Sequence, residues 1–274
     1  MTPFEWPELG LAGLRQTRGE RPVLALHGWL DNARSHAPLA PYLDGIDLVA
    51  LEFPGHGRSR PRPEGVRYHF DDYVFDVLAA ADRLGWSDFH LLGHSLGGAV
   101  ACLTAAACPE RVRSLVLIEG LGPISAPPDR AAAGWRQARR GSHLRPRRQH
   151  PTPASAVAAR ARNSDLDERC AELLAERGLV EQDGGFVWGH DLRLTWPSTQ
   201  RYTEAQVLDL IAAIECPVMN LYSDPPSGLV PARLLQRRLA ALRKGQWRAF
   251  PGGHHLHMHH PDQLGPVIQE FFDV

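Results

Sequence analysis

Short apolar runs alternate along this chain with longer segments whose apolar residues recur at helical spacing. The runs are nearly continuous in Val, Leu, Ile and Ala, which is typical of parallel strands buried on both faces. They begin at Pro22, Ile46, Phe89, Arg113, Pro217 and Gln246. The helical patterns that separate them begin at Phe70, Leu96, Pro231 and Asp262. This repetition of strand and helix predicts βαβ units around a mostly parallel sheet. A looser alternation from Glu8 predicts an antiparallel strand at the start of that sheet.

One segment, 122–214, interrupts this rhythm because it holds no convincing buried strand. It opens with the Pro- and Gly-rich stretch GPISAPPDR, which marks a departure from the sheet. Helix-like pieces such as ASAVAARA and LDERCAELLAERG follow. We therefore expect an inserted, mainly helical subdomain over 122–214, between a first core segment 1–121 and a second core segment 215–274.

The composition is that of an ordinary soluble domain, with 274 residues, 43% hydrophobic and 22% charged. A net charge of −1 gives no reason to expect a nucleic-acid partner or an anionic membrane surface. No run approaches the ~18 apolar residues of a membrane span, and no secretory signal precedes the first strand. The four cysteines lack zinc-ligand spacing. A reduced, cytoplasmic protein without stable membrane insertion is expected, and the oligomeric state is left open.

The stretch Gly93-His94-Ser95-Leu96-Gly97 matches G-x-S-x-G at the junction of an apolar run and a helical pattern. Such a sharp strand-to-helix turn strains the serine, and its glycines allow close backbone approach. The helix N-terminus then offers N–H groups to a developing oxyanion. The pentapeptide alone is a weak signal, but this context makes Ser95 the expected nucleophile rather than a structural serine.

Four motifs together carry a resemblance to a known family: LHGWLDN, LEFPGHGRS, GHSLGG and the terminal GGHH. In this order they resemble the α/β-hydrolase superfamily. More narrowly, HGWLDNA, FPGHGRS, LIEGLGP and GGHHLHM resemble its serine hydrolase-like branch. The resemblance implies an α/β-hydrolase fold, with a mostly parallel central sheet, helices on both faces and an inserted helical cap. It implies a Ser–acid–His triad but names no substrate.

The resemblance also assigns the oxyanion hole to the backbone N–H groups of Trp29 and Leu96. The alternative for the His27–Gly28 step before Trp29 is a tight loop with a buried histidine. Asp31 could lie near the pocket mouth or cap a loop, and the glycines around His56 are expected to serve a cramped turn. Candidate substrate-binding residues are His27, Asp31, His94 and Trp135.

The triad acid has two candidates. In the superfamily it commonly follows the penultimate strand, but here Pro226 stands at the usual Asp position and Asp224 lies two residues early. The other site is the end of the preceding strand, where Glu119 follows a mostly apolar run. A glutamate buried there needs a partner, which would be the catalytic histidine or an arginine of the cap. We prefer Glu119 and keep Asp224 as the alternative.

Five histidines crowd the stretch before Pro261, namely His254, His255, His257, His259 and His260. The superfamily carries its catalytic histidine in a Gly-His loop before the terminal helix, a place held by His254, with His255 as alternative. The others are expected to shape the pocket or face solvent. A metal needs three or four converging ligands, which one loop rarely supplies, so no metal is expected.

The inserted segment carries aromatic residues that could line a pocket or form the cap's own core: Trp135, Phe186, Trp188, Trp196 and Tyr202. It also carries seven arginines, which could contact an anionic partner but more simply form a solvated face: Arg130, Arg136, Arg139, Arg140, Arg145, Arg147 and Arg148.

The expected function is that of a serine hydrolase of esterase type, which cleaves a carboxylic ester or related acyl compound without metal or organic cofactor. Its expected partner is a small-molecule acyl substrate. Alternatives on the same triad are a thioesterase, a C–C bond hydrolase and an acyltransferase. A non-catalytic binding protein on a hydrolase scaffold is a further alternative. Epoxide hydrolase and dehalogenase activities are disfavoured because they need an Asp at position 95.

Overall fold

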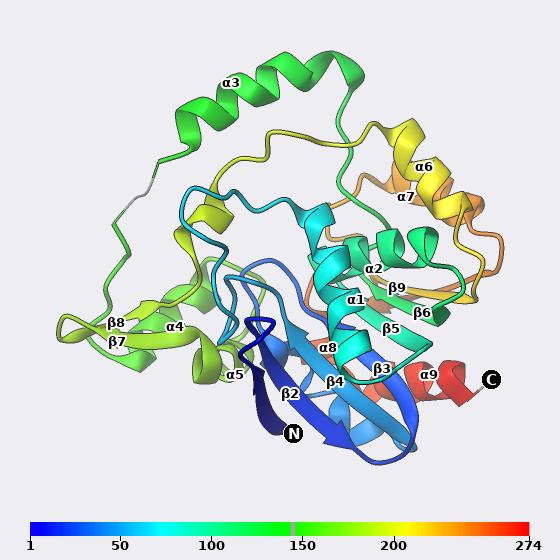
Figure 1. Ribbon diagram of the computed structural model, residues 1–274, viewed down its shortest axis with the longest axis horizontal. Coiled ribbons are helices and arrows are strands. Elements are labelled where there is room, and N and C mark those ends of the chain that lie inside the picture. The colour runs from blue at the N-terminus through cyan, green and yellow to red at the C-terminus, as the bar shows by residue number, and fades with distance from the viewer. Residues whose placement is uncertain (144–145, 274) are drawn as a thin grey trace.

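A computed structural model describes residues 1–143 and 146–273, so Arg145 of the arginine-rich stretch lies outside the described residues. The core is an eight-stranded sheet in the order β1-β2-β4-β3-β5-β6-β9-β10 (Figure 1). Its strands are β1 (Thr2–Trp6), β2 (Leu11–Thr17), β3 (Arg21–Leu26), β4 (Ile46–Glu52), β5 (Phe89–His94), β6 (Val112–Ile118), β9 (Val218–Asp224) and β10 (Gly245–Pro251). The pairs β1–β2 and β2–β4 are antiparallel, and all other neighbours are parallel.

The central strands are buried on both faces because apolar clusters cover each side. One cluster joins the sheet to helices on one face: α1 (Tyr73–Arg83), α2 (Leu96–Ala107), α6 (Glu204–Ala212) and α7 (Ala232–Ala241). The other cluster joins it to short 3-10 turns, η1 (Ala33–His36) and η2 (Ala40–Tyr42), and to α8 (Leu256–His259) and α9 (Pro261–Asp273). The predicted mostly parallel sheet with helices on both faces is therefore present.

Two features of the sheet differ from the sequence analysis. The first strand, β1, was not predicted, since TPFEW is short and carries a proline, yet it pairs along its full length with β2. The last strand, β10, was expected to be buried, but its side chains are largely exposed. It lies at the sheet edge with β9 as its one neighbour, so a strand can form there without burial on both faces.

In its described residues, the inserted segment holds three helices that stand away from the sheet and a small hairpin. The helices are α3 (Ala131–Gly141), α4 (Pro153–Arg162) and α5 (Glu168–Gly178), and the hairpin is β7 (Leu179–Gln182) with β8 (Gly185–Trp188). A short turn precedes α3, η4 (Pro128–Arg130), and another follows the hairpin, η5 (Leu192–Thr195). The sequence analysis stressed helices and did not foresee the hairpin. Figure 1 shows this segment rising from the end of the sheet and returning through α6, which packs on α2 and α7.

Candidate active site

Ser95 stands at the sharp turn between β5 and α2. Its φ of 52° and ψ of −114° lie in a region that L-residues rarely occupy. A Cβ at Gly93 would come within 2.6 Å of the Gly97 carbonyl oxygen, and one at Gly97 would come within 2.1 Å of the Leu26 carbonyl oxygen. Both positions therefore require glycine. The Ser95 N–H donates to the Ile118 carbonyl at 3.0 Å, which holds the strained turn against β6.

His254 approaches this serine from the loop between β10 and α8. Its Nε2 lies 2.8 Å from the Ser95 Oγ, so the hydroxyl can donate to it when the ring proton is on Nδ1. The His254 side chain is 23% exposed and therefore reachable from solvent. The strand end at β5 and the loop after β10 thus bring residues 95 and 254 into direct hydrogen-bond contact.

Glu119 completes this arrangement from the position directly after β6. Its Oε2 lies 3.5 Å from the His254 Nδ1, and its backbone φ is 51°. The Ser223 N–H donates to Oε1 at 2.5 Å, and the Ser227 hydroxyl donates to Oε2. Burial of the side chain, which is 6% exposed, opposes ionisation, but the bonds from His254, Ser227 and Ser223 outweigh it and lower the Glu119 pKa.

Asp224, the alternative acid, ends β9 with an exposed side chain. Across residues 1–143 and 146–273, the carboxylate within 4.0 Å of a His254 ring nitrogen is that of Glu119 alone. The neighbour of Asp224, Ser223, instead donates its backbone N–H to Glu119. The end of β9 therefore contributes to the site as a support for the glutamate.

Trp29 and Leu96 are placed on two adjacent backbone segments. Leu96 is the first residue of α2, where helix N–H groups lack intrahelical partners. The carbonyl of His27, just before the Gly28–Trp29 step, accepts the Gly97 N–H at 3.1 Å, which ties the loop after β3 to the start of α2. The Trp29 indole is 52% exposed and donates to the Leu194 carbonyl of η5 at 3.1 Å.

The four candidate substrate-binding residues lie in two different environments. His27, Asp31 and His94 are buried among protein groups. His27 accepts the Phe53 N–H through Nε2 at 3.1 Å and faces the Gly28 carbonyl through Nδ1, and burial lowers its pKa. Trp135, on α3, is 59% exposed. The first three thus support the backbone around the site, whereas Trp135 faces solvent.

The remaining terminal histidines also fall into two groups. His255 is buried and bonds to two aspartates, Asp31 and Asp165. His257 is buried with its ring centroid 4.2 Å from that of His94, and burial lowers its pKa. The side chains of His259 and His260 are half-buried. His255 is thus an ion-pair residue, which the sequence analysis did not predict.

Buried ion pairs attach the inserted segment to the core. Arg177 of α5 makes two bonds, of 2.6 and 2.7 Å, to the fully buried Glu52 at the end of β4. A Cβ on Gly57 would come within 2.2 Å of the Glu52 carboxyl, so the PGHG turn packs directly on this acid. Arg160 of α4 bonds to Asp31 at 3.0 Å. Sequence reasoning missed both pairs, although a glutamate closing an apolar run was a signal for the first.

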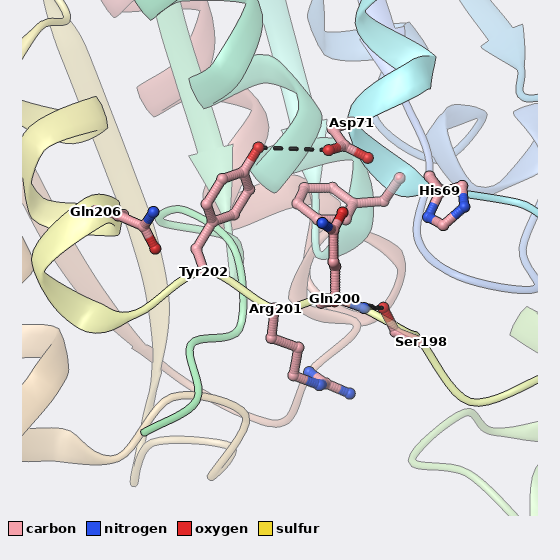
Figure 2. A pocket seen from close by; sticks show the side chains of 8 residues that line it. His69, Asp71, Ser198, Gln200, Arg201, Tyr202 and Gln206 are labelled. Carbon is pink, nitrogen blue, oxygen red and sulfur yellow. Dashed lines mark hydrogen bonds between the residues drawn. The ribbon is translucent and has the colours of Figure 1, made fainter. Parts of the chain in front are cut away.

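A cavity of about 150 Å³ lies between the segment before α1 and the segment before α6 (Figure 2). It is lined by His69, Phe70, Asp71, Ser198, Gln200, Arg201, Tyr202 and Gln206. The Tyr202 hydroxyl donates to Asp71 across it at 3.4 Å. Its lining does not include Ser95 or His254, so this cavity alone does not define a substrate position.

A strained serine at a strand-to-helix turn, paired with a histidine and a carboxylate from later strand ends, is an arrangement typical of α/β-type hydrolases. The chain belongs to the alpha/beta hydrolase fold family, whose model matches residues 21–261. This confirms the predicted superfamily and fold. Within the described part of the chain, every helix is too short or too polar to cross a membrane.

More narrowly, the chain belongs with the serine hydrolase-like proteins. It is 31% identical over 287 residues to the serine hydrolase-like protein of Danio rerio, covering 98% of this chain and 86% of that one. The crystal structure of a hypothetical protein from Pseudomonas aeruginosa PAO1 is similar at a TM-score of 0.89 and 40% identity, over 96% of each chain. A thioesterase domain from the curacin biosynthetic pathway matches at 0.80 and 24% identity over 94% of this chain and 93% of that one, a likeness of fold alone.

Proposed function

We propose that this hydrolase cleaves a carboxylic ester or related acyl compound through an acyl-enzyme on Ser95. The observation that carries the proposal is the 2.8 Å contact between the His254 Nε2 and the Ser95 Oγ at a strained strand-to-helix turn. A serine hydroxyl is a weak nucleophile by itself and needs a base within hydrogen-bond reach. His254 provides that base, and Glu119 on its other ring nitrogen holds the required tautomer.

In the proposed reaction the Ser95 Oγ attacks the carbonyl carbon while its proton moves to the His254 Nε2. The N–H groups of Trp29 and Leu96 stabilise the oxyanion, each contributing roughly 10²–10³ in rate. The imidazolium of His254 then returns the proton to the departing oxygen of the alcohol. A water molecule, deprotonated by the same histidine, attacks the acyl-enzyme and releases the acid, and the Ser95 hydroxyl is restored.

The segment 122–214 is proposed to act as the cap of this site. Its support is that η5 accepts a bond from the Trp29 indole and that arginines of α4 and α5 pair with buried acids of the core. We assign substrate contact to the exposed Trp29 and the reachable Ser95–His254 pair, and backbone support to the buried His27 and His94. The proposed substrate is a small acyl compound, and the scheme uses no metal or organic cofactor.

The test is labelling of the purified protein by a fluorophosphonate probe, together with a panel of p-nitrophenyl esters of graded chain length and acyl-CoA thioesters. Wild-type protein should label and hydrolyse at least one ester, and Ser95→Ala should do neither. Ser125→Ala is a matched control, because the Ser125 hydroxyl donates to Glu204 and this serine lies outside the nucleophile turn. Labelling that persists in Ser95→Ala would refute Ser95 as the nucleophile. Turnover of thioesters alone would show that the protein is a thioesterase and not an esterase.

A further inference from the structure

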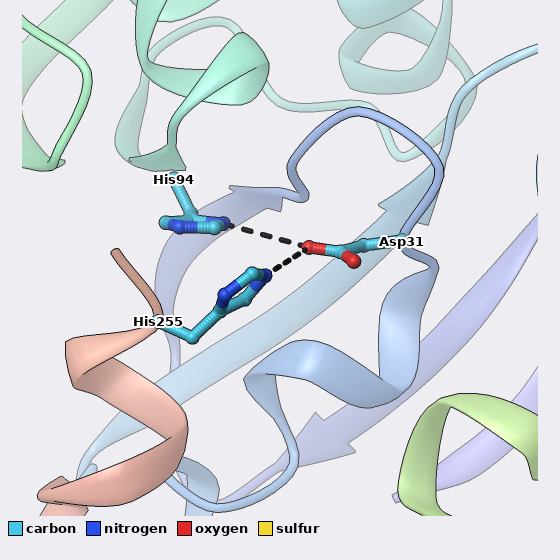
Figure 3. Close-up of side chains that lie close together, drawn as sticks. All are labelled: Asp31, His94 and His255. Carbon is cyan, nitrogen blue, oxygen red and sulfur yellow. Dashed lines mark hydrogen bonds and ion pairs between the residues drawn. The ribbon is translucent and has the colours of Figure 1, made fainter. Parts of the chain in front are cut away.

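A compact group of charged side chains lies directly behind the Ser95–His254 pair. Asp31, whose side chain is 1% exposed, faces the rings of both His94 and His255 (Figure 3). Its Oδ2 lies 3.3 Å from the His255 Nε2 and 3.7 Å from the His94 Nδ1. Its other oxygen accepts from the Arg160 guanidinium at 3.0 Å. The Ser–His–Glu arrangement uses none of these contacts.

His255 is held by a carboxylate on each ring nitrogen. Its Nε2 faces Asp31, and its Nδ1 bonds to Asp165, in the loop between α4 and α5. The Asp165 Oδ2 also accepts the His255 backbone N–H at 2.9 Å. Only an imidazolium can donate to both acids at once. Burial disfavours that charge, but the bonds to Asp165 and Asp31 outweigh it and raise the His255 pKa to about 9.

The charges in this group balance without any further ion. Two carboxylates, Asp31 and Asp165, meet two cations, Arg160 and the His255 imidazolium. Asp31, His94 and His255 have residue types that also bind metals. A divalent ion there would have to displace the His255 proton beside a guanidinium, so the charge balance favours an ion-pair network.

This network joins three of the segments that carry the proposed chemistry, those of Trp29, Ser95 and His254, but not the segment of Glu119. Asp31 lies two residues after Trp29, and His255 directly follows His254. His94 directly precedes Ser95, and its Nε2 faces the His254 carbonyl oxygen at 2.9 Å. Through Asp165 and Arg160 the network also reaches the inserted segment. The oxyanion loop, the nucleophile turn, the histidine loop and the cap therefore share one connected set of contacts.

We propose that His255 is a positioning residue whose imidazolium, clamped between Asp31 and Asp165, fixes the His254 loop and the cap for acyl transfer. The inference rests on the proposed function. A neutral His255 could donate to only one of its two acids, and the clamp on the loop would then open on one side. Catalytic competence should therefore be lost as His255 gives up its proton at alkaline pH.

The groups that face His255 determine the pH at which it loses its proton. From the core these are Asp31 and His94, and from the cap they are Asp165 and, through Asp31, Arg160. His254, His257 and His259 adjoin it on its own segment. The carboxylates favour the imidazolium, whereas the charge of Arg160 opposes it. Removing a carboxylate and removing Arg160 should therefore shift the pH midpoint in opposite directions.

The experiment measures the rate of fluorophosphonate labelling of Ser95 between pH 6 and 10. Wild-type labelling should fall with a midpoint near the His255 pKa of about 9. Asp165→Asn removes one carboxylate but keeps its shape, so the midpoint should fall by about 1 to 3 pH units. At pH 9 the labelling rate of this variant should then be about fivefold lower if the midpoint has fallen by one pH unit, and about tenfold lower again for each further unit. Glu172→Gln, on the exposed side of α5, is the matched control and should retain the wild-type profile.

A second variant, Arg160→Met, separates positioning from general loosening of the cap. Removing this cation should move the midpoint upward, opposite to Asp165→Asn. A downward shift in both variants, or an unshifted profile in a folded Asp165→Asn protein, would overturn the proposal. So would loss of wild-type labelling on chelation with recovery on added zinc. If wild-type protein fails to label at all, the proposed function fails, and that result is distinct from an altered pH profile.

Discussion

Replacing Glu119 by Gln should nearly abolish turnover while leaving the fold intact. The Gln carbonyl oxygen can still accept the Ser223 N–H, which lies 2.5 Å from the present Oε1. Its amide group would then face the His254 Nδ1 and donate to it. The ring proton would then be forced onto Nε2. Catalysis requires that nitrogen to be unprotonated, so that it can accept the proton of the Ser95 hydroxyl.

The expected size of this effect follows from the geometry. Fixing the wrong tautomer in a triad of this kind costs up to about 10⁴-fold in kcat. The 3.5 Å distance between His254 and Glu119 is longer than a strong charge-assisted bond, so we expect a loss of about 10³-fold. That loss corresponds to about 4 kcal/mol in the activation barrier.

The assay is kcat on the best ester of the panel, with Asp224→Asn as the matched control. Because the Asp224 side chain is exposed, that change should alter kcat by no more than about twofold. Circular dichroism checks that both variants are folded. A loss of orders of magnitude in Asp224→Asn, with Glu119→Gln nearly unaffected, would refute the assignment of the acid.

Two further predictions concern stability. Arg177→Met should lower the free energy of unfolding in urea by about 3–5 kcal/mol, because it leaves the fully buried Glu52 without its cation. The double variant with Glu52→Gln should recover most of that loss. An unchanged urea midpoint in the single variant would contradict this account. The stabilisation by His255 should be fully present below about pH 6.5 and disappear as pH rises through about 9, since its pKa is higher in the folded state. The difference in melting temperature between wild type and His255→Gln should therefore narrow over that range, and a difference independent of pH would argue against a buried imidazolium.

The fold could be predicted from the sequence because its signals are local. Buried strands such as β4 and β5 consist almost wholly of apolar residues, and the glycines around Ser95 mark a turn that other residues cannot form. The edge strands were harder. β10 is exposed and β1 is short, so neither carries the apolar run that marks a buried strand.

The site was predictable to the extent that its residues stand at strand ends. The serine motif and the Gly-His loop named Ser95 and His254 directly. Spacing favoured Glu119 over Asp224 but left both open, since the two residues stand at the ends of neighbouring parallel strands, β6 and β9, which meet at the same edge of the sheet. Ion pairs such as Arg177–Glu52 join residues 125 positions apart and leave no periodic signal in either segment.

By itself, the sequence determined the layered fold, the sharp turn at Ser95 and the loop that carries His254, because hydrophobic periodicity and glycine placement act over a few residues. Only the tertiary structure decided which carboxylate faces His254 and which histidine of the terminal cluster is an ion-pair residue. These outcomes depend on distances between separate strand ends and the inserted segment. Burial then fixes the charge states, because an acid such as Asp31 is tolerated inside the protein only where cations from other elements reach it.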